Sequence, residues 1–222
     1  LRQAERMADI GQIAAMVGHD LRSPLAGIRN AAYVLKIRAS SKLDEKEKQM
    51  LEAIDNSVSH SNNIISDLLD LSREVKIEKQ PKDLKELVQH SLEFANVPKN
   101  VEVKDLIPEN VIVEAAEDKM KRIFTNIIKN AAEAMPNGGL LTIEFATDGA
   151  NLSISFTDTG SGMTDETLQK LWTPLFTTKT QGVGLGLVVC KRYIEAHGGT
   201  ITAKSALSKG TTFTMTLPAV TK

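Results

Sequence analysis

An apolar stripe with alternating spacings of three and four residues runs through the first third of the chain. Its first part comprises Met7, Ile10, Ala14, Val17, Leu21, Pro24, Ile28, Ala31 and Leu35, the seven-residue repeat of a coiled coil kept for about four repeats. Its second part comprises Leu43, Met50, Ile54, Ser57, Ser61, Ile64, Leu68, Leu71 and Val75. Between them, Asp44 and Glu47 have the spacing of a capping box. Residues 1–77 are therefore predicted to form two long helices joined by a short loop. Because a lone hairpin would leave this stripe exposed, we expect two copies to pair as a four-helix bundle.

The composition excludes several classes of partner. The formal net charge of the 222 residues is −1, which offers no case for nucleic acid or an anionic membrane surface as the main partner. No run of 18 apolar residues and no signal peptide occurs. The single cysteine, Cys190, lies in an apolar run and is expected to be a buried thiol in a reducing compartment. We expect a cytoplasmic chain without membrane contact; because it begins at Leu1, we expect a piece of a longer protein, which a preceding segment could anchor in a membrane.

The pattern changes at Pro81, which ends the helical periodicity. Helices are predicted near 84–95 with Asp83 as N-cap, from Asp118 as N-cap through Met135, and near 185–196. Strands are predicted at 101–105, 111–114, 140–147, 152–158, 200–205 and 211–217. This alternation predicts an α/β sandwich over residues 78–222, so the fold class is α + α/β in two domains.

The segment HDLRSPL places His19 beside Asp20 in the first predicted helix. The heptad arithmetic puts His19 at an f position, facing away from the stripe, where it is either an ordinary surface histidine or a reactive one. A carboxylate can hold one ring nitrogen as a donor and leave the lone pair of the other free. Pro24 removes the N–H that would bond the carbonyl of Asp20, so the helix is predicted to bend just past His19. Counting back from a turn near residue 41 places the polar segment 57–63 level with His19, either as a docking surface or as a polar layer that sets the register.

Two groups of residues in the second domain suggest a nucleotide site. Glycines recur in DTGSGM (158–163), GVGLGL (182–187) and KGTTFTMTLP (from 209), without a Walker loop or a dinucleotide fingerprint. Singly, each fits an ordinary turn; together they let backbone approach phosphates, while Asp158 can accept from an adenine amino group. Asn126 and Asn130 are one helical turn apart, flanked by Lys129 and Glu133. Their amides are either ordinary surface groups or ligands for Mg²⁺ and phosphate.

Taken in order, these segments resemble the conserved boxes of the sensor histidine kinases of two-component systems. HDLRSPL is similar to the H box and NIIKNAAEAM to the N box. DTGSGM, LWTPLFTTK, GVGLGL and GTTFTMTLP are similar to the remaining boxes, so the resemblance covers nearly the whole chain. It implies a dimeric phosphotransfer hairpin followed by a Bergerat-type (GHKL) ATP-binding domain. The short segment between Phe176 and Gly182 resembles the lid of the nitrogen-regulation subgroup.

The resemblance also implies roles for individual residues. His19 would be the phosphoacceptor, Asp20 would orient or deprotonate it, and Asn130 would hold Mg²⁺ between the ATP phosphates. The other ATP contacts it implies are Asn126, Lys129, Asp158, Gly160, Gly162, Lys179, Gly182, Gly184, Leu185, Gly186, Thr211 and Thr212. Ser23 stands where many relatives have threonine or asparagine for dephosphorylating the partner, so that activity is left open.

The implied reaction is autophosphorylation of His19 by Mg·ATP within a homodimer, followed by transfer to an aspartate of a response-regulator receiver domain. Pro24 and the segment Lys79-Gln80-Pro81 are predicted hinges for this motion. Two rival hypotheses are a dimeric ATP-binding scaffold that transfers no phosphate, and an ATPase or serine kinase of the same fold. The asparagine at position 126, where related ATPases carry a glutamate that activates water, disfavours simple hydrolysis.

Overall fold

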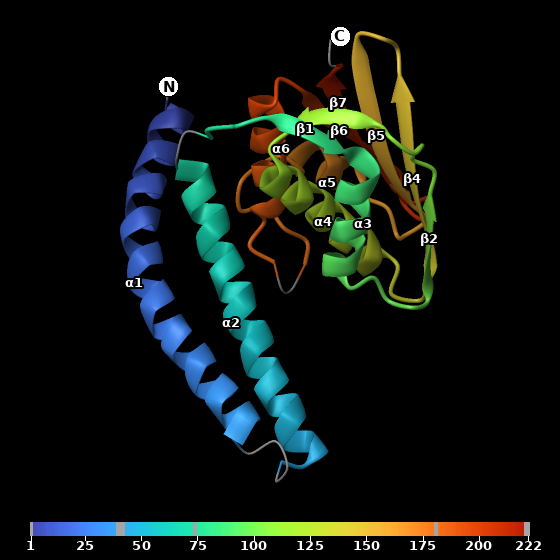
Figure 1. Ribbon diagram of the computed structural model, residues 1–222. Coiled ribbons are helices and arrows are strands. Elements are labelled where there is room, and N and C mark those ends of the chain that lie inside the picture. Colours follow the sequence, from blue (N-terminus) through green and yellow to red (C-terminus); the bar gives the residue numbers. More distant parts are fainter. Residues whose placement is uncertain (1, 39–42, 73–74, 180–181, 220–222) are drawn as a thin grey trace. The chain divides into compact units, whose positions relative to one another are not determined.

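The chain forms two compact units, Leu1–Glu74 and Val75–Lys222. The computed structural model describes residues 2–38, 43–72, 75–179 and 182–219, and for residues 2–17, 19 and 72 it describes the backbone alone. The first unit is the predicted hairpin of α1 (Arg2–Arg38) and α2 (Glu45–Ser72) (Figure 1). No helix among the described residues has the length and apolar character needed to cross a membrane.

The start of α2 follows the local chemistry that the sequence indicated. The backbone N–H of Glu47 donates to the Asp44 carboxylate at 2.7 Å, and the N–H of Asp44 donates to Glu47 at 2.8 Å. This reciprocal pair is the predicted capping box. Helix α1 continues through Pro24 without a break, and its ribbon bows gently along its length (Figure 1); a local bend just past His19 stays a prediction.

Much of the described part of the predicted apolar stripe is not buried in the single hairpin, although Leu71 of its second part is. In α1, Gly18 and Ala32 are buried and Leu25 is half-buried, and in α2 the buried residues are Leu51, Val58, Ile65, Leu69 and Leu71. Residues of the predicted stripe are exposed in the single chain, among them Leu21 (46%), Ile28 (50%), Leu35 (56%) and Met50 (62%). A helix in a four-helix bundle needs apolar residues on two flanks. The sequence pattern identified the flank that α2 does not cover.

The register of the two hairpin helices differs slightly from the one obtained by counting residues from a turn near residue 41. A Cβ placed on Gly18 would lie 2.9 Å from Ile65 Cγ2 and 3.5 Å from Leu69 Cδ1. Residues level with His19 therefore begin at about 64, just past the polar segment 57–63 whose end the count places there. The polar segment is shifted toward the level of Ser23 and Pro24.

The second unit is a five-stranded mixed sheet in the order β2-β4-β5-β7-β6, with helices on one face (Figure 1). Its elements are β1 (Gln80–Asp83), α3 (Leu84–Ala95), β2 (Val101–Asp105), β3 (Ile112–Ala115), α4 (Glu117–Ala134), β4 (Gly139–Thr147), β5 (Asn151–Asp158), α5 (Asp165–Lys170), α6 (Gly186–Ala196), β6 (Thr200–Ser205) and β7 (Thr211–Pro218). Alternate residues of β5 and β7 are buried toward the helices, for example Phe156 against Phe124 of α4. The predicted α/β sandwich is confirmed.

Several local predictions about the second unit need correction. The N-cap of α4 is Ala116, which has no capping side chain, and Asp118 lies in the first turn, where a negative charge favours the helix dipole. Helix α5 and strand β1 were not predicted. Gln80 pairs with Ala115 in the β1–β3 ladder, and Lys79 Nζ donates to the His197 carbonyl at 2.8 Å. Because these bonds fix residues 79–81 to their own domain, that segment is not a hinge.

Candidate functional site

Asp158 lies at the end of the central strand β5 and is 3% exposed. Its Oδ1 accepts hydrogen bonds from the backbone N–H of Gly160 at 2.8 Å and of Thr211, on the adjacent β7, at 3.2 Å. Burial raises the pKa of this carboxyl, while the two N–H donors act in the opposite direction. Both hydrogen bonds go to Oδ1, so Oδ2 is left to accept from a ligand.

The backbone around Asp158 is built so closely that it requires glycine. Gly162 has φ +64°, and a Cβ there would lie 2.0 Å from the carbonyl oxygen of Ala206. Any side chain would push the 158–163 loop away from the turn that precedes β7. Gly162 therefore allows the loop to lie against the turn before β7, and Gly160 allows it to lie against the end of α4, where a Cβ would be 2.6 Å from the carbonyl oxygen of Ala134.

A second group of polar residues gathers where α4 meets the start of α6. Asn126 and Asn130 share one face of α4, as predicted, and Asn130 Nδ2 donates to Asn126 Oδ1 at 3.2 Å. A Cβ on Gly186, the first residue of α6, would lie 2.3 Å from Asn126 Nδ2. Gly186 thus allows the glycine-rich segment to approach the asparagine pair. The structure thus brings together two motifs whose residues Asn126 and Gly186 are 60 positions apart in the sequence.

Lys179 reaches the same group from the segment between α5 and α6. Its ammonium group donates to Asn130 Oδ1 and to the carboxylate of Glu133. Gly182 and Gly184 continue this segment toward α6, and Gly184 has φ +69°. The part of the predicted lid at 180–181 lies outside the described residues.

Three predicted ATP contacts are not brought into this arrangement. Thr212 points to the opposite face of the sheet from Asp158, where its Oγ1 is 3.0 Å from Thr157 Oγ1. The side chain of Leu185 is buried in the core, so only its backbone could face a ligand. Lys129 is exposed on α4, and its contact with phosphate stays a prediction.

The predicted catalytic residues of the hairpin lie together on α1. Asp20 and Ser23 are exposed on this helix, and Gly18 is buried against α2. The side chain of His19 is outside the described residues. Among the described residues, no cluster of three or more His, Cys, Asp or Glu side chains could hold a metal ion. A metal at Asn130 would therefore depend on phosphate oxygens for most of its ligands.

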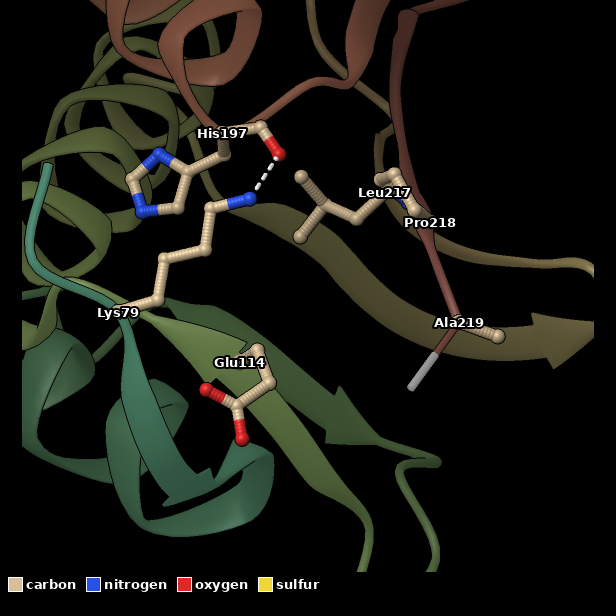
Figure 2. Close-up of a pocket in the computed structure, with 6 residues that line it drawn as sticks. All are labelled: Lys79, Glu114, His197, Leu217, Pro218 and Ala219. Carbon is tan, nitrogen blue, oxygen red and sulfur yellow. Dashed lines mark hydrogen bonds between the residues drawn. The ribbon is translucent and has the colours of Figure 1, made fainter. Parts of the chain in front are cut away.

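His197 is a buried histidine that the sequence analysis missed (Figure 2). Its Nε2 accepts from the backbone N–H of Ala116 at 3.0 Å, and its Nδ1 lies 2.6 Å from the Tyr193 carbonyl. With these partners the ring is neutral and carries its proton on Nδ1. Because Ala116 is the N-cap of α4, the imidazole accepts from the N-cap N–H, the group that an N3 glutamate or glutamine would bond in a capping box. The HGG sequence after α6 was the available signal, since a histidine before two glycines marks a helix end.

Acid should destabilise the second unit through His197. Burial lowers the pKa of His197, the bond to Tyr193 opposes this, and the charge of Lys79 adds to it. The contribution of His197 to the free energy of unfolding is fully present above its pKa in the unfolded chain, about 6.5. This contribution is lost as the pH falls toward its lower pKa in the folded chain, by up to about 1.4 kcal/mol per pH unit. Denaturant unfolding followed by the single tryptophan, Trp172, should show this slope, and His197→Gln should remove it while His90→Gln, on α3, should not. Equal slopes in wild type and His197→Gln would contradict it.

The fold and site define a class of protein. Residues 9–75 match the family "His Kinase A (phospho-acceptor) domain", and residues 115–221 match "Histidine kinase-, DNA gyrase B-, and HSP90-like ATPase". The chain therefore belongs to the histidine protein kinases: a phospho-acceptor hairpin precedes an ATPase domain. This confirms the predicted class.

Individual relatives match almost the whole of this chain. Sensor histidine kinase ZraS of Escherichia coli (strain K12) is 32% identical over 98% of this chain and 47% of its own length. Sporulation kinase B of Bacillus subtilis (strain 168) is 35% identical over 99% of this chain and 52% of its own length. The chain thus spans about half the length of these relatives.

Solved structures share the fold. Full-length ShkA in complex with AMPPNP superposes with a TM-score of 0.74 at 23% identity over 95% of this chain and 46% of that one. The catalytic domain of the histidine kinase ThkA superposes with a TM-score of 0.58 at 29% identity over 64% of this chain and 95% of that one.

Proposed function

We propose that the second unit binds Mg·ATP and transfers its γ-phosphoryl group to a ring nitrogen of His19. The observation that carries the proposal is the convergence of Asn126, Asn130, Lys179 and the start of α6 in the domain that also buries Asp158. Asp158 Oδ2 would accept from the adenine amino group, and the N-terminus of α6 and Lys179 would face the phosphates. Asn130 Oδ1, which accepts a hydrogen bond from the ammonium group of Lys179 in the structure, would contribute to holding Mg²⁺. The metal would neutralise phosphate charge.

In the proposed step, the lone pair of the His19 nitrogen forms the new bond to the γ-phosphorus. The bond between that phosphorus and the β,γ-bridging oxygen breaks, and ADP leaves with the electron pair. Asp20 would hold the proton on the other ring nitrogen and stabilise the charge that develops on the imidazole. Asn126 is a poor general base, so water in the site would not be activated.

The proposal extends to the partners of the kinase. A second copy would cover the exposed stripe of the hairpin, which includes Leu21, Ile28 and Leu35, to form a homodimer. The phosphoryl group would then pass to an aspartate of a response-regulator receiver domain, at the cytoplasmic side of a membrane if the whole protein is anchored there. The seven-residue segment from Phe176 to Gly182 supports placing the chain with the short-lid, nitrogen-regulation-like kinases.

Replacing Asn130 should weaken nucleotide binding mainly by removing the contribution of Mg²⁺. For Asn130→Ala we expect a roughly 10- to 100-fold loss of affinity for ATP in the presence of Mg²⁺. Calorimetry with and without Mg²⁺ checks this, since the variant should bind ATP about as wild type does without the metal. Affinity equal to that of wild type with Mg²⁺ would count against the site.

Ser23 should act on the partner more than on His19. It lies exposed on α1, four residues and about one helical turn after the phosphoacceptor, where its hydroxyl could orient a water molecule. For Ser23→Ala we expect dephosphorylation of the receiver domain to slow by up to about tenfold, the upper value of one hydrogen bond between neutral groups, with autophosphorylation little changed. Ser23→Thr keeps the hydroxyl and should retain the activity. Equal loss of both reactions in Ser23→Ala would mean that Ser23 is only structural.

A further inference from the structure

Glu133 and Lys179 form an ion pair at the edge of the proposed nucleotide site. Glu133 is three residues after Asn130, on the same face of α4. The ammonium group of Lys179 touches both side chains, the Asn130 oxygen and the Glu133 carboxylate. Their side chains are 42% (Lys179) and 57% (Glu133) exposed, so the pair is open to solvent.

This arrangement conflicts with the bound state in one respect. A lysine ammonium group and Mg²⁺ on the same Asn130 oxygen would place two positive charges side by side, where they repel each other. When Mg·ATP binds, Lys179 must therefore leave Asn130. A phosphate oxygen offers it a stronger anionic acceptor than a neutral amide does.

The carboxylate of Glu133 has no role in the proposed transfer. By itself, a negative charge at this place disfavours a triphosphate, because like charges repel. The contact with Lys179 gives Glu133 a role, because the carboxylate keeps the lysine within reach of the phosphate site while no nucleotide is bound. It also competes with those phosphates for the same ammonium group.

We propose that Glu133 is a positioning residue that holds Lys179 beside Asn130 in the nucleotide-free enzyme and gives it up when Mg·ATP binds. The inference rests on the proposed function, because it takes Lys179 as a phosphate contact. An exposed ion pair is weak, so releasing Lys179 costs little free energy. The effect of Glu133 on ATP affinity is therefore small, and its direction is to weaken binding. Removing the carboxylate should tighten binding.

The test is calorimetry of Mg·ATP with the 222-residue chain and four variants. Glu133→Gln should bind roughly two- to fivefold more tightly than wild type, and Lys179→Gln should bind more weakly. In the Lys179→Gln background, adding Glu133→Gln should have less than about half of its effect in the wild-type background, which is the double-mutant measure of coupling. Glu109→Gln is the matched control, since it also removes an exposed carboxylate paired with a lysine, Lys85, and should leave affinity unchanged.

The outcomes separate this inference from the proposed function. Tighter binding that depends on Lys179 supports it, and damage to the fold could not produce that sign. Unchanged or weaker binding in Glu133→Gln, with normal binding by wild type, overturns the inference and leaves the proposed function standing. Tightening that persists fully without Lys179 also overturns it, because Glu133 would then act directly on the phosphates. Failure of wild type to bind Mg·ATP overturns the proposed function as well.

Discussion

The variant His19→Gln should lose all acid-labile labelling from ATP while binding ATP as wild type does. Glutamine is similar in size to histidine and is well tolerated in a helix. Its amide nitrogen, however, has no lone pair available to attack phosphorus. The proposed pocket lies entirely in the second unit, so its affinity for ATP should be unchanged. Labelling with γ-labelled ATP followed by acid treatment measures the first effect, and calorimetry measures the second.

His60 supplies the matched control for this experiment. It is an exposed histidine on α2 of the same hairpin, so His60→Gln makes the same chemical change in the same unit. It should leave labelling intact. Full labelling of His19→Gln, or loss in both variants, would contradict the assignment of His19.

The second large effect is expected at Asp158. Asp158→Asn keeps an oxygen to accept from Gly160 and Thr211, but it replaces Oδ2 with an NH₂ group that faces the adenine amino group, donor against donor. ATP affinity should fall roughly 10- to 100-fold, the cost of losing a hydrogen bond to a charged group. Inosine triphosphate, which carries an acceptor oxygen in place of that amino group, should lose less or gain.

The comparison of the two nucleotides by calorimetry tests how the base is recognised. Asp148→Asn is the control, because Asp148 accepts two backbone N–H bonds in the β4–β5 turn and is exposed. A similar loss for ATP and inosine triphosphate in Asp158→Asn would show that the variant damages the pocket rather than its choice of base.

Local chemistry in the sequence predicted most of the fold. The caps at Asp44 and Asp83 are formed by side chains that bond backbone two or three residues away, so a short stretch of sequence contains all the information. The alternation in β5 and β7 likewise follows from burial of one face. Asn126 and Asn130 could be paired from helical spacing alone.

The failures share a physical reason, since they depend on partners far away in the sequence. The N–H of the α4 N-cap, Ala116, is bonded by His197, 81 residues further along the chain. Residues 79–81 were taken for a hinge because nothing nearby reveals the β1–β3 ladder or the bond from Lys79 to His197. The heptad stripe could not show which flank meets α2 and which is left for another chain.

Thr212 and Glu133 show the same limit at the site. A motif predicts which residues gather, but the pleat of β7 turns Thr211 inward and Thr212 outward. The partnership of Glu133 with Lys179 joins two segments 46 residues apart, and only the folded chain reveals it.

The central claim is that the γ-phosphoryl group of ATP is transferred to His19. The most direct measurement is to incubate the wild-type chain with Mg·ATP and locate the phosphate by mass spectrometry of its peptides under neutral conditions. We predict one acid-labile, base-stable phosphoryl group in the peptide that contains HDLRSPL, on His19. Phosphate on a serine or threonine, or release of ADP with no phosphate on His19, would contradict it.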